Sequence, residues 1–151
     1  MKLTKEQRRV IRDLFDGHCA YCGCDLGEKW HADHVEPVLR DGSFVLKPGA
    51  HFATWKCNGK MRAEHNDHLG NFFPACIKCN VLKSSGTVED LRRTLSYFAE
   101  STPRISGYSH VHHLMRFGKL FIDPEPVVFY FERVQAQRSV DGADMLAGKE
   151  R

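Results

Sequence analysis

The chain of 151 residues has the length of one ordinary domain, and its composition is 42% hydrophobic and 27% charged. These values exclude a disordered or fibrous protein, and no apolar run is long enough to cross a membrane. The net charge of +3 is compatible with a polyanionic partner but does not require one. The first residues are polar and predict no secretory signal, so we expect a reducing, cytoplasmic setting.

The first predicted element is a helix that begins at Thr4 and ends near Gly17. Gln7 lies three residues after Thr4, as a capping box requires. Apolar residues recur at helical spacing at Val10, Ile11, Leu14 and Phe15. The basic residues largely off this stripe are Lys5, Arg8, Arg9 and Arg12. They could contact nucleic-acid phosphate or form a solvated surface, and the pattern leaves both readings open.

Two short strands with a long insert between them are predicted next. Residues 30–35 and 71–73 have the composition of strands, and Pro74 is expected to stop the second. Residues 38–70 carry glycine and proline punctuation, so we expect an irregular segment. It includes a basic run with one aromatic residue, namely Trp55, Lys56, Lys60 and Arg62. This run could follow a nucleic-acid backbone or remain a solvated loop.

The second half of the chain is predicted to be mainly helical. One helix fits residues 76–85, and another begins at Thr87 with a second capping box. A third, shorter helix is expected to end near Gly118. Residues 127–131 are β-branched or aromatic and predict a strand, while residues 135–151 are polar and predict a flexible tail.

Two pairs of cysteines have the spacing of metal-binding hooks. They are Cys19 with Cys22, and Cys76 with Cys79. Two such hooks complete a tetrahedral site, for which zinc is the preferred ion, and four thiolates leave no position for water. We therefore expect a structural zinc ion; the redox alternative combines one such pair with a βαβ pattern that this chain lacks. The remaining Cys24 and Cys57 are expected to be free thiols.

A second, oxygen-rich site is predicted beside the cysteines. Asp33 and His34 lie on the first strand, and Asn80 shares one helix face with Cys76 and Cys79. If zinc holds that helix against the first cysteine pair, Asn80 should face Asp33. A carboxylate and an amide oxygen suit Mg²⁺ or Mn²⁺, with substrate phosphate completing the shell. His34 could then act as general base in phosphodiester hydrolysis, since the ordinary pKa of histidine is near neutrality.

These motifs resemble those of the HNH endonuclease family, which is built on a ββα-metal finger. The matching segments, in order, are residues 19–23, residues 33–37, residues 71–80 and Lys83. The resemblance ends near residue 90, and the last third of the chain carries no recognisable motif. It implies a metal-dependent DNA endonuclease with structural zinc and one catalytic Mg²⁺ or Mn²⁺, and the expected partner is double-stranded DNA.

The resemblance also implies a role for each matching residue. His34 matches the general base, and Asp33 matches a metal ligand. Asn71 matches the middle asparagine of the motif, which steadies the loop and the orientation of the base. Asn80 falls where the family has a final histidine or, in a common variant, asparagine. Lys83 matches a residue that contacts backbone phosphate.

The expected fold class is α+β, with a small ββα-metal finger between an N-terminal helix and a C-terminal helix and strand elaboration. The expected nuclease domain spans residues 1–134, with the finger at residues 19–86 and the elaboration at residues 87–134, before the tail. A non-catalytic, zinc-stabilised nucleic-acid-binding module is the alternative. Small free-standing nucleases of this type resemble those of bacteria and bacteriophages. The target sequence, the oligomeric state and the choice between nicking and double-strand cutting stay open.

Overall fold

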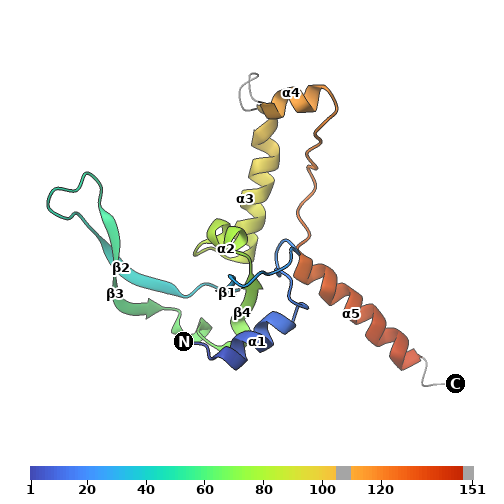
Figure 1. Cartoon of the computed structure of the whole chain (residues 1–151), viewed down its shortest axis with the longest axis horizontal. Coiled ribbons are helices and arrows are strands. Elements are labelled where there is room, and N and C mark those ends of the chain that lie inside the picture. The colour runs from blue at the N-terminus through green and yellow to red at the C-terminus, as the bar shows by residue number, and fades with distance from the viewer. Residues whose placement is uncertain (105–109, 148–151) are drawn as a thin grey trace.

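The computed structural model describes residues 1–104 and 110–147, and in the last helix it describes side chains as far as residue 139. Within these residues the chain is α+β (Figure 1). The helices are α1 (Lys5–Asp13), α2 (Ile77–Lys83), α3 (Val88–Ser101), α4 (His110–Arg116) and α5 (Tyr130–Ala147). The strands are β1 (His31–His34), β2 (Leu39–Val45), β3 (Thr54–Arg62) and β4 (Phe72–Ala75). Three short 3₁₀ turns are η1 (Glu64–Asn66), η2 (Leu69–Asn71) and η3 (Thr102–Arg104).

The central sheet consists of β1 and β4, which pair antiparallel with Asp33 opposite Phe73 and His34 opposite Phe72. Both predicted strands are therefore confirmed. The sequence predicted that Pro74 would stop the second strand, and this prediction is wrong. Pro74 lies inside β4, opposite Ala32. Each strand of a two-stranded sheet has a free edge, so proline is tolerated there without breaking the ladder. The carbonyl of Pro74 accepts a hydrogen bond from the backbone N–H of Ala20 at 2.8 Å, which joins β4 to the first cysteine segment.

The insert between the central strands is a second antiparallel sheet, not the irregular segment that the sequence predicted. β2 and β3 pair over most of their length and extend away from the rest of the chain (Figure 1). Gly42, expected to mark a loop, lies in β2 opposite Cys57, beside an irregularity that follows Arg40. A Cβ atom at Gly42 would lie only 2.4 Å from the Lys56 carbonyl oxygen, so glycine permits the close approach of the two strands.

The helix starts follow the predicted capping pattern. The Thr4 and Thr87 side chains accept hydrogen bonds from the backbone N–H groups of Gln7 and Asp90, and both capping boxes are complete. α1 ends at Asp13, before the predicted end at residue 17. α2 lies within the range predicted for it, and the third predicted helix is α4. No helix in the described part of the chain has the length and apolar character needed to span a membrane.

The last helix replaces a predicted strand. α5 begins at Tyr130, in the middle of the aromatic run, and continues over residues 135–147, where the sequence predicted a flexible tail. The Glu132 carboxylate accepts a hydrogen bond from the backbone N–H of Phe129 at 2.8 Å, which satisfies a free donor at the helix start. The N–H groups of Tyr130 and Phe131 donate to the carbonyls of Tyr21 and Ala20 instead of to a neighbouring strand. Tertiary contacts therefore outweigh the β-propensity of this run.

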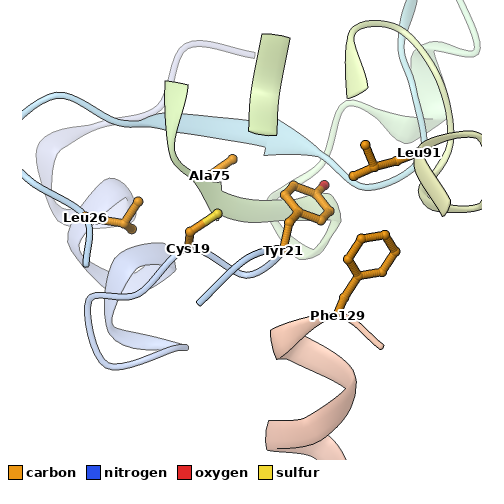
Figure 2. Close-up of a cluster of buried hydrophobic side chains, with 6 residues drawn as sticks. All are labelled: Cys19, Tyr21, Leu26, Ala75, Leu91 and Phe129. Atoms are coloured by element: carbon orange, nitrogen blue, oxygen red, sulfur yellow. The ribbon is translucent and has the colours of Figure 1, made fainter. Parts of the chain in front are cut away.

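A small core joins the first cysteine segment to β4, α3 and the start of α5. Its buried members are Cys19, Tyr21, Leu26, Ala75, Leu91 and Phe129. Figure 2 shows the Tyr21 and Phe129 rings next to each other at the centre of this group, and their centroids are 5.9 Å apart in an edge-to-face arrangement. Phe129 thereby anchors α5 to the segment that carries the first two cysteines.

Replacing Phe129 should be costly, because a cavity would form where four segments meet. We expect Phe129→Ala to lower the free energy of unfolding by about 3–5 kcal/mol, measured by urea denaturation. Phe121→Ala is the matched control: the residue is 82% exposed, against 2% for Phe129, and its loss should change stability by less than about 0.5 kcal/mol. Equal effects of the two substitutions would contradict this description of the core.

Candidate functional site

Four cysteine sulfur atoms form a cluster at one side of the central sheet. The ligand atoms of Cys19, Cys22, Cys76 and Cys79 all lie within 4.8 Å of one another, and the Cys22 and Cys76 sulfurs are 3.9 Å apart. Sulfurs at the corners of a tetrahedron with Zn–S distances of about 2.3 Å would be separated by about 3.8 Å. The predicted grouping is confirmed, and the cluster could bind a metal ion such as zinc.

Backbone geometry prepares these sulfur atoms for a metal. Cys76 is the N-cap of α2, and its sulfur accepts a hydrogen bond from the Cys79 N–H at 3.4 Å. The Cys19 sulfur accepts one from the Cys76 N–H at 3.3 Å. A hydrogen bond from the Cys79 side chain, reinforced by backbone N–H groups, lowers the pKa of Cys19 to about 4, and the same contact raises the pKa of Cys79. The cluster therefore favours a thiolate, which is the form that binds metals.

The other two cysteines do not join the cluster. Cys24 and Cys57 are exposed free thiols, as the sequence predicted. Cys24 lies close in sequence to the first pair but is not among the four residues whose sulfur atoms converge. The Cys24 thiol nevertheless makes hydrogen bonds with the Cys22 and Cys76 side chains, so Cys57, which lies on β3, is the internal control for experiments on the other four.

An open cleft of about 680 Å³ lies between β1, the end of α2 and the β2–β3 hairpin. Asp33, His34 and Lys83 line one side of it. Arg40, Trp55 and Arg62 are among the hairpin residues that line the other. The cleft thus brings a carboxylate and an imidazole from β1 opposite positively charged and aromatic side chains.

Asp33 is buried at this cleft and is held by partners from two other segments. Its Oδ2 atom accepts hydrogen bonds from the Tyr21 hydroxyl at 2.5 Å and is 3.2 Å from the Lys83 ammonium. Burial, together with the negative charge of Asp33, raises the pKa of Tyr21, so the phenol remains a donor. No hydrogen bond from a described residue reaches the Asp33 Oδ1 atom. One carboxylate oxygen is therefore committed to the fold, and the other is available to a ligand.

Lys83 occupies a different position from the one that its predicted phosphate contact requires. Its side chain is only 1% exposed, and its ammonium donates to the His34 carbonyl at 2.7 Å as well as facing Asp33. Removing either charge of such a buried pair would leave the other unpaired, which is strongly destabilising. In this arrangement Lys83 positions Asp33 and His34, and its ammonium is not presented to a nucleic-acid backbone.

His34 lines the cleft, and the orientation of its ring is fixed. Its Nε2 atom is 2.9 Å from the Asp67 Oδ1 atom, and its ring packs on Phe72 at 4.2 Å between centroids. Burial lowers the pKa of His34; the positive charges of Lys83 and Arg40 act in the same direction, and the charge of Asp33 opposes them. The imidazole is therefore neutral at neutral pH. With the proton on Nε2 and donated to Asp67, Nδ1 is free to accept another.

Asn71 fixes the backbone that follows His34. Its buried side chain accepts a hydrogen bond from the Glu36 N–H at 2.9 Å and donates to the carbonyls of Glu36 and Asn66, each at 2.8 Å. Its own carbonyl accepts from the Val35 N–H at 2.9 Å. The carboxamide and the backbone carbonyl of Asn71 thus join the residues that follow His34 to η1. Asn71 can orient the base without touching a substrate.

Asn80 is not brought into the same cluster. It lies half-buried on α2, where its backbone joins the helix, and it is not among the residues that line the cleft. Its side chain makes no hydrogen bond with a described residue. The structure therefore brings Asp33, His34 and Asn71 together and leaves the predicted metal-ligand role of Asn80 a prediction.

The basic residues of α1 hold the first cysteine segment. The Arg8 guanidinium donates to the Trp30 carbonyl at 3.0 Å and lies 4.2 Å from the centroid of the Trp30 ring. Arg12 donates to the Leu26 carbonyl at 2.7 Å. Arg9 is exposed and pairs with a glutamate of its own helix at 2.6 Å. Two of the three arginines thus have a structural task, and their predicted phosphate contacts stay predictions.

Two residues of the site were missed by the sequence analysis. Tyr21 was a spacer between Cys19 and Cys22; a tyrosine that becomes buried needs a hydrogen-bond partner, which was the available signal. Asp67 lies inside the insert that was predicted to be irregular, and its contact with His34 spans 33 residues of sequence. No local pattern indicates such a contact.

No protein-family model matches this sequence, and a search of curated proteins and of solved structures finds no similar protein. A function for the chain is therefore inferred from the side chains of the cleft and of the cysteine cluster. The resemblance of their motifs supplies the chemistry to be tested.

The cysteine cluster predicts a selective effect of single substitutions. Cys76→Ser should release bound zinc and unfold the segments that the cluster joins, because a structural metal contributes directly to folding. Zinc content per chain by elemental mass spectrometry and helicity by circular dichroism measure both effects. Cys57→Ser, at an exposed position of β3 outside the cluster, should keep the zinc and the fold. A folded Cys76→Ser protein with unchanged zinc content would contradict the assignment.

Proposed function

We propose that this chain is a metal-dependent DNA endonuclease of the HNH type, which hydrolyses phosphodiester bonds. The observation that carries the proposal is the placement of His34: its imidazole lines an open cleft, is fixed by Asp67, and adjoins the buried carboxylate of Asp33. A neutral, oriented imidazole next to an available carboxylate oxygen is the minimum that metal-assisted hydrolysis of a phosphodiester needs.

In the proposed reaction, His34 takes a proton from the attacking water. Nδ1 is the accepting atom when Nε2 donates to Asp67, and the Asp67 carboxylate stabilises the imidazolium that results. Asn71 keeps the loop after His34 in place through its hydrogen bonds to Glu36, so the base does not have to be ordered during the reaction.

A divalent cation fits the donor set at Asp33. The Oδ1 atom of this buried carboxylate has no partner among the described residues, while Oδ2 is held by Tyr21 and Lys83. We assign Asp33 as one protein ligand and retain Asn80 as the second from the motif. Mg²⁺ and Mn²⁺ commonly use few protein ligands and keep several waters. When bound, the ion supplies positive charge at the phosphate and at the leaving oxygen.

The cysteine cluster has a structural part in this proposal. β1, β4 and α2 follow the order strand, strand, helix, and the second cysteine pair lies at the start of that helix. We interpret this unit as a ββα-metal finger whose zinc ion is closed off by four thiolates. Such an ion leaves no position for water, so it holds the finger together and takes no part in hydrolysis.

Two observations favour the second candidate, a zinc-stabilised module that binds nucleic acid without cutting it. The charge of Asp33 is already neutralised by Lys83, and Asn80 does not line the cleft. Both features weaken the cation site relative to one with two free oxygen ligands. Supercoiled plasmid distinguishes the candidates: the nuclease relaxes or linearises it with Mg²⁺ or Mn²⁺, and the binding module leaves it intact with either ion.

Substitution of the proposed base gives the direct test. His34→Ala should lower the rate of plasmid cleavage by at least about a hundredfold, which is the lower end of what a general base contributes. Circular dichroism should show that its fold is kept. His31→Ala is the matched control, since His31 lies on the same strand, is exposed, and does not line the cleft. Equal cleavage by the two variants would contradict the role of His34.

The pH dependence of cleavage provides a second readout of the same base. The reactive form is the neutral imidazole, and the pKa of His34 lies below its ordinary value of about 6.5. The rate should therefore rise with pH on the acid side of 6.5 and be level through neutrality, and the residual activity of His34→Ala should lack this rise. A rise centred above neutrality would show that another group is the base.

A further inference from the structure

The β2–β3 hairpin concentrates the positive charge of the whole chain. Residues 38–62 contain five lysines and arginines and one aspartate, which gives this segment a net charge of +4, against +3 for all 151 residues. The remainder of the chain is therefore close to neutral. Because the hairpin forms one side of the cleft, a polyanion would be drawn to that side first.

The two faces of β3 differ in what they offer the cleft. Trp55 and Cys57 line it, whereas Lys56 between them does not, as expected for a strand whose side chains alternate. From the rest of the hairpin, Arg40 and Arg62 also line the cleft. Arg62 is paired with a hairpin aspartate at 2.9 Å, whereas Arg40 makes no ion pair with a described residue. Among the described residues on this side of the cleft, Arg40 is therefore the cation without an ion-pair partner.

Trp55 is exposed without a packing role in the core. It is 49% exposed, and the ring of Phe44 lies 5.1 Å from it at an interplanar angle of 73°. Phe44 supports the indole edge-to-face, and Trp55 also borders the cleft. An indole held in this way, in the same cleft as a free guanidinium, is the combination that binds unpaired nucleic acid, by base stacking and by phosphate contact.

We infer that the cleft takes an unpaired single strand of DNA, with a base stacked on Trp55, a phosphate at Arg40 and the backbone facing His34. A base in a duplex has both faces covered by its neighbours, so stacking on the indole requires an unpaired base. The cleft volume of about 680 Å³ lies in the range of about 300–1,000 Å³ for sites that take one small ligand. The cleft has room for one or two nucleotides of a strand.

The inference rests on the proposed function only in taking DNA as the substrate, and its test needs no cleavage. His34→Ala protein without added Mg²⁺ or Mn²⁺ is titrated with a labelled oligothymidine strand and with a duplex of equal length, and binding is followed by fluorescence anisotropy. We expect tighter binding of the single strand, accompanied by quenching of tryptophan emission. Adding Trp55→Leu should weaken single-strand binding by about tenfold and abolish the quenching, since Trp30 packs against Arg8.

Two substitutions that each remove one positive charge from the hairpin show whether the position of the charge matters for binding. Arg40→Gln should weaken binding and lower the slope of log K against log salt by about 0.7, the value for one phosphate contact on a single strand. Lys56→Gln removes the same charge from a residue that does not line the cleft, and it should leave the slope unchanged. Equal changes in both variants would show that the hairpin acts only through its net charge, which would overturn the inference.

The remaining outcomes separate this inference from the proposed function. Duplex bound as tightly as the single strand, an oligouridine RNA strand bound more tightly than DNA, or unchanged binding by Trp55→Leu would each overturn the inference, whatever the plasmid experiment gives. Single-strand binding with Trp55 quenching, by a parent protein that never cuts DNA, would support the inference and overturn the nuclease.

Discussion

The convergence of four cysteine sulfur atoms is the constraint on which the rest of the structure depends. Cys19 and Cys76 are 57 residues apart in sequence, yet the four sulfurs lie within 4.8 Å of one another. The buried core beside them is small, and small domains commonly need a metal or a disulfide to remain folded. A metal ion at the cluster would close the loop that contains β1, the hairpin and β4. Without it, thiolates this close would repel one another.

The same constraint reaches the cleft through Tyr21. This residue lies between the first two cysteines, and its hydroxyl holds the buried Asp33, which in turn faces Lys83 at the end of α2. The Lys83 ammonium also donates to the carbonyl of His34. The first cysteine segment, through Tyr21, and the helix of the second cysteine pair, through Lys83, therefore both help to position β1, which carries the proposed base. A loss of metal would therefore disturb the cleft by displacing Asp33 and His34, even though the two sites share no ligand.

Features encoded over a few residues were predictable, and those that depend on distant contacts were not. Capping boxes at Thr4 and Thr87 and the cysteine spacing are local chemistry, so the helix starts and the cluster followed from sequence. The hairpin was missed because nearly every residue of β3 is exposed, and the apolar–polar alternation that indicates a strand arises only when one face is buried. The strand predicted around Phe129 was wrong for the opposite reason. The β-propensity of its neighbours indicates a strand, but the burial of Phe129 in the core fixes the start of a helix there.

Asp33 and His34 were predictable from their motif, whereas Asp67 is paired with His34 by tertiary structure alone.

X-ray absorption at the zinc edge tests the central claim most directly. If the four cysteines hold one structural ion, the purified chain should bind about one zinc, with four sulfur scatterers at about 2.3 Å and no nitrogen or oxygen ligand. Scatterers at about 2.0–2.1 Å in place of one or more sulfurs would indicate histidine, carboxylate or water in the shell. Such a spectrum, or a folded chain that binds no metal, would contradict the account.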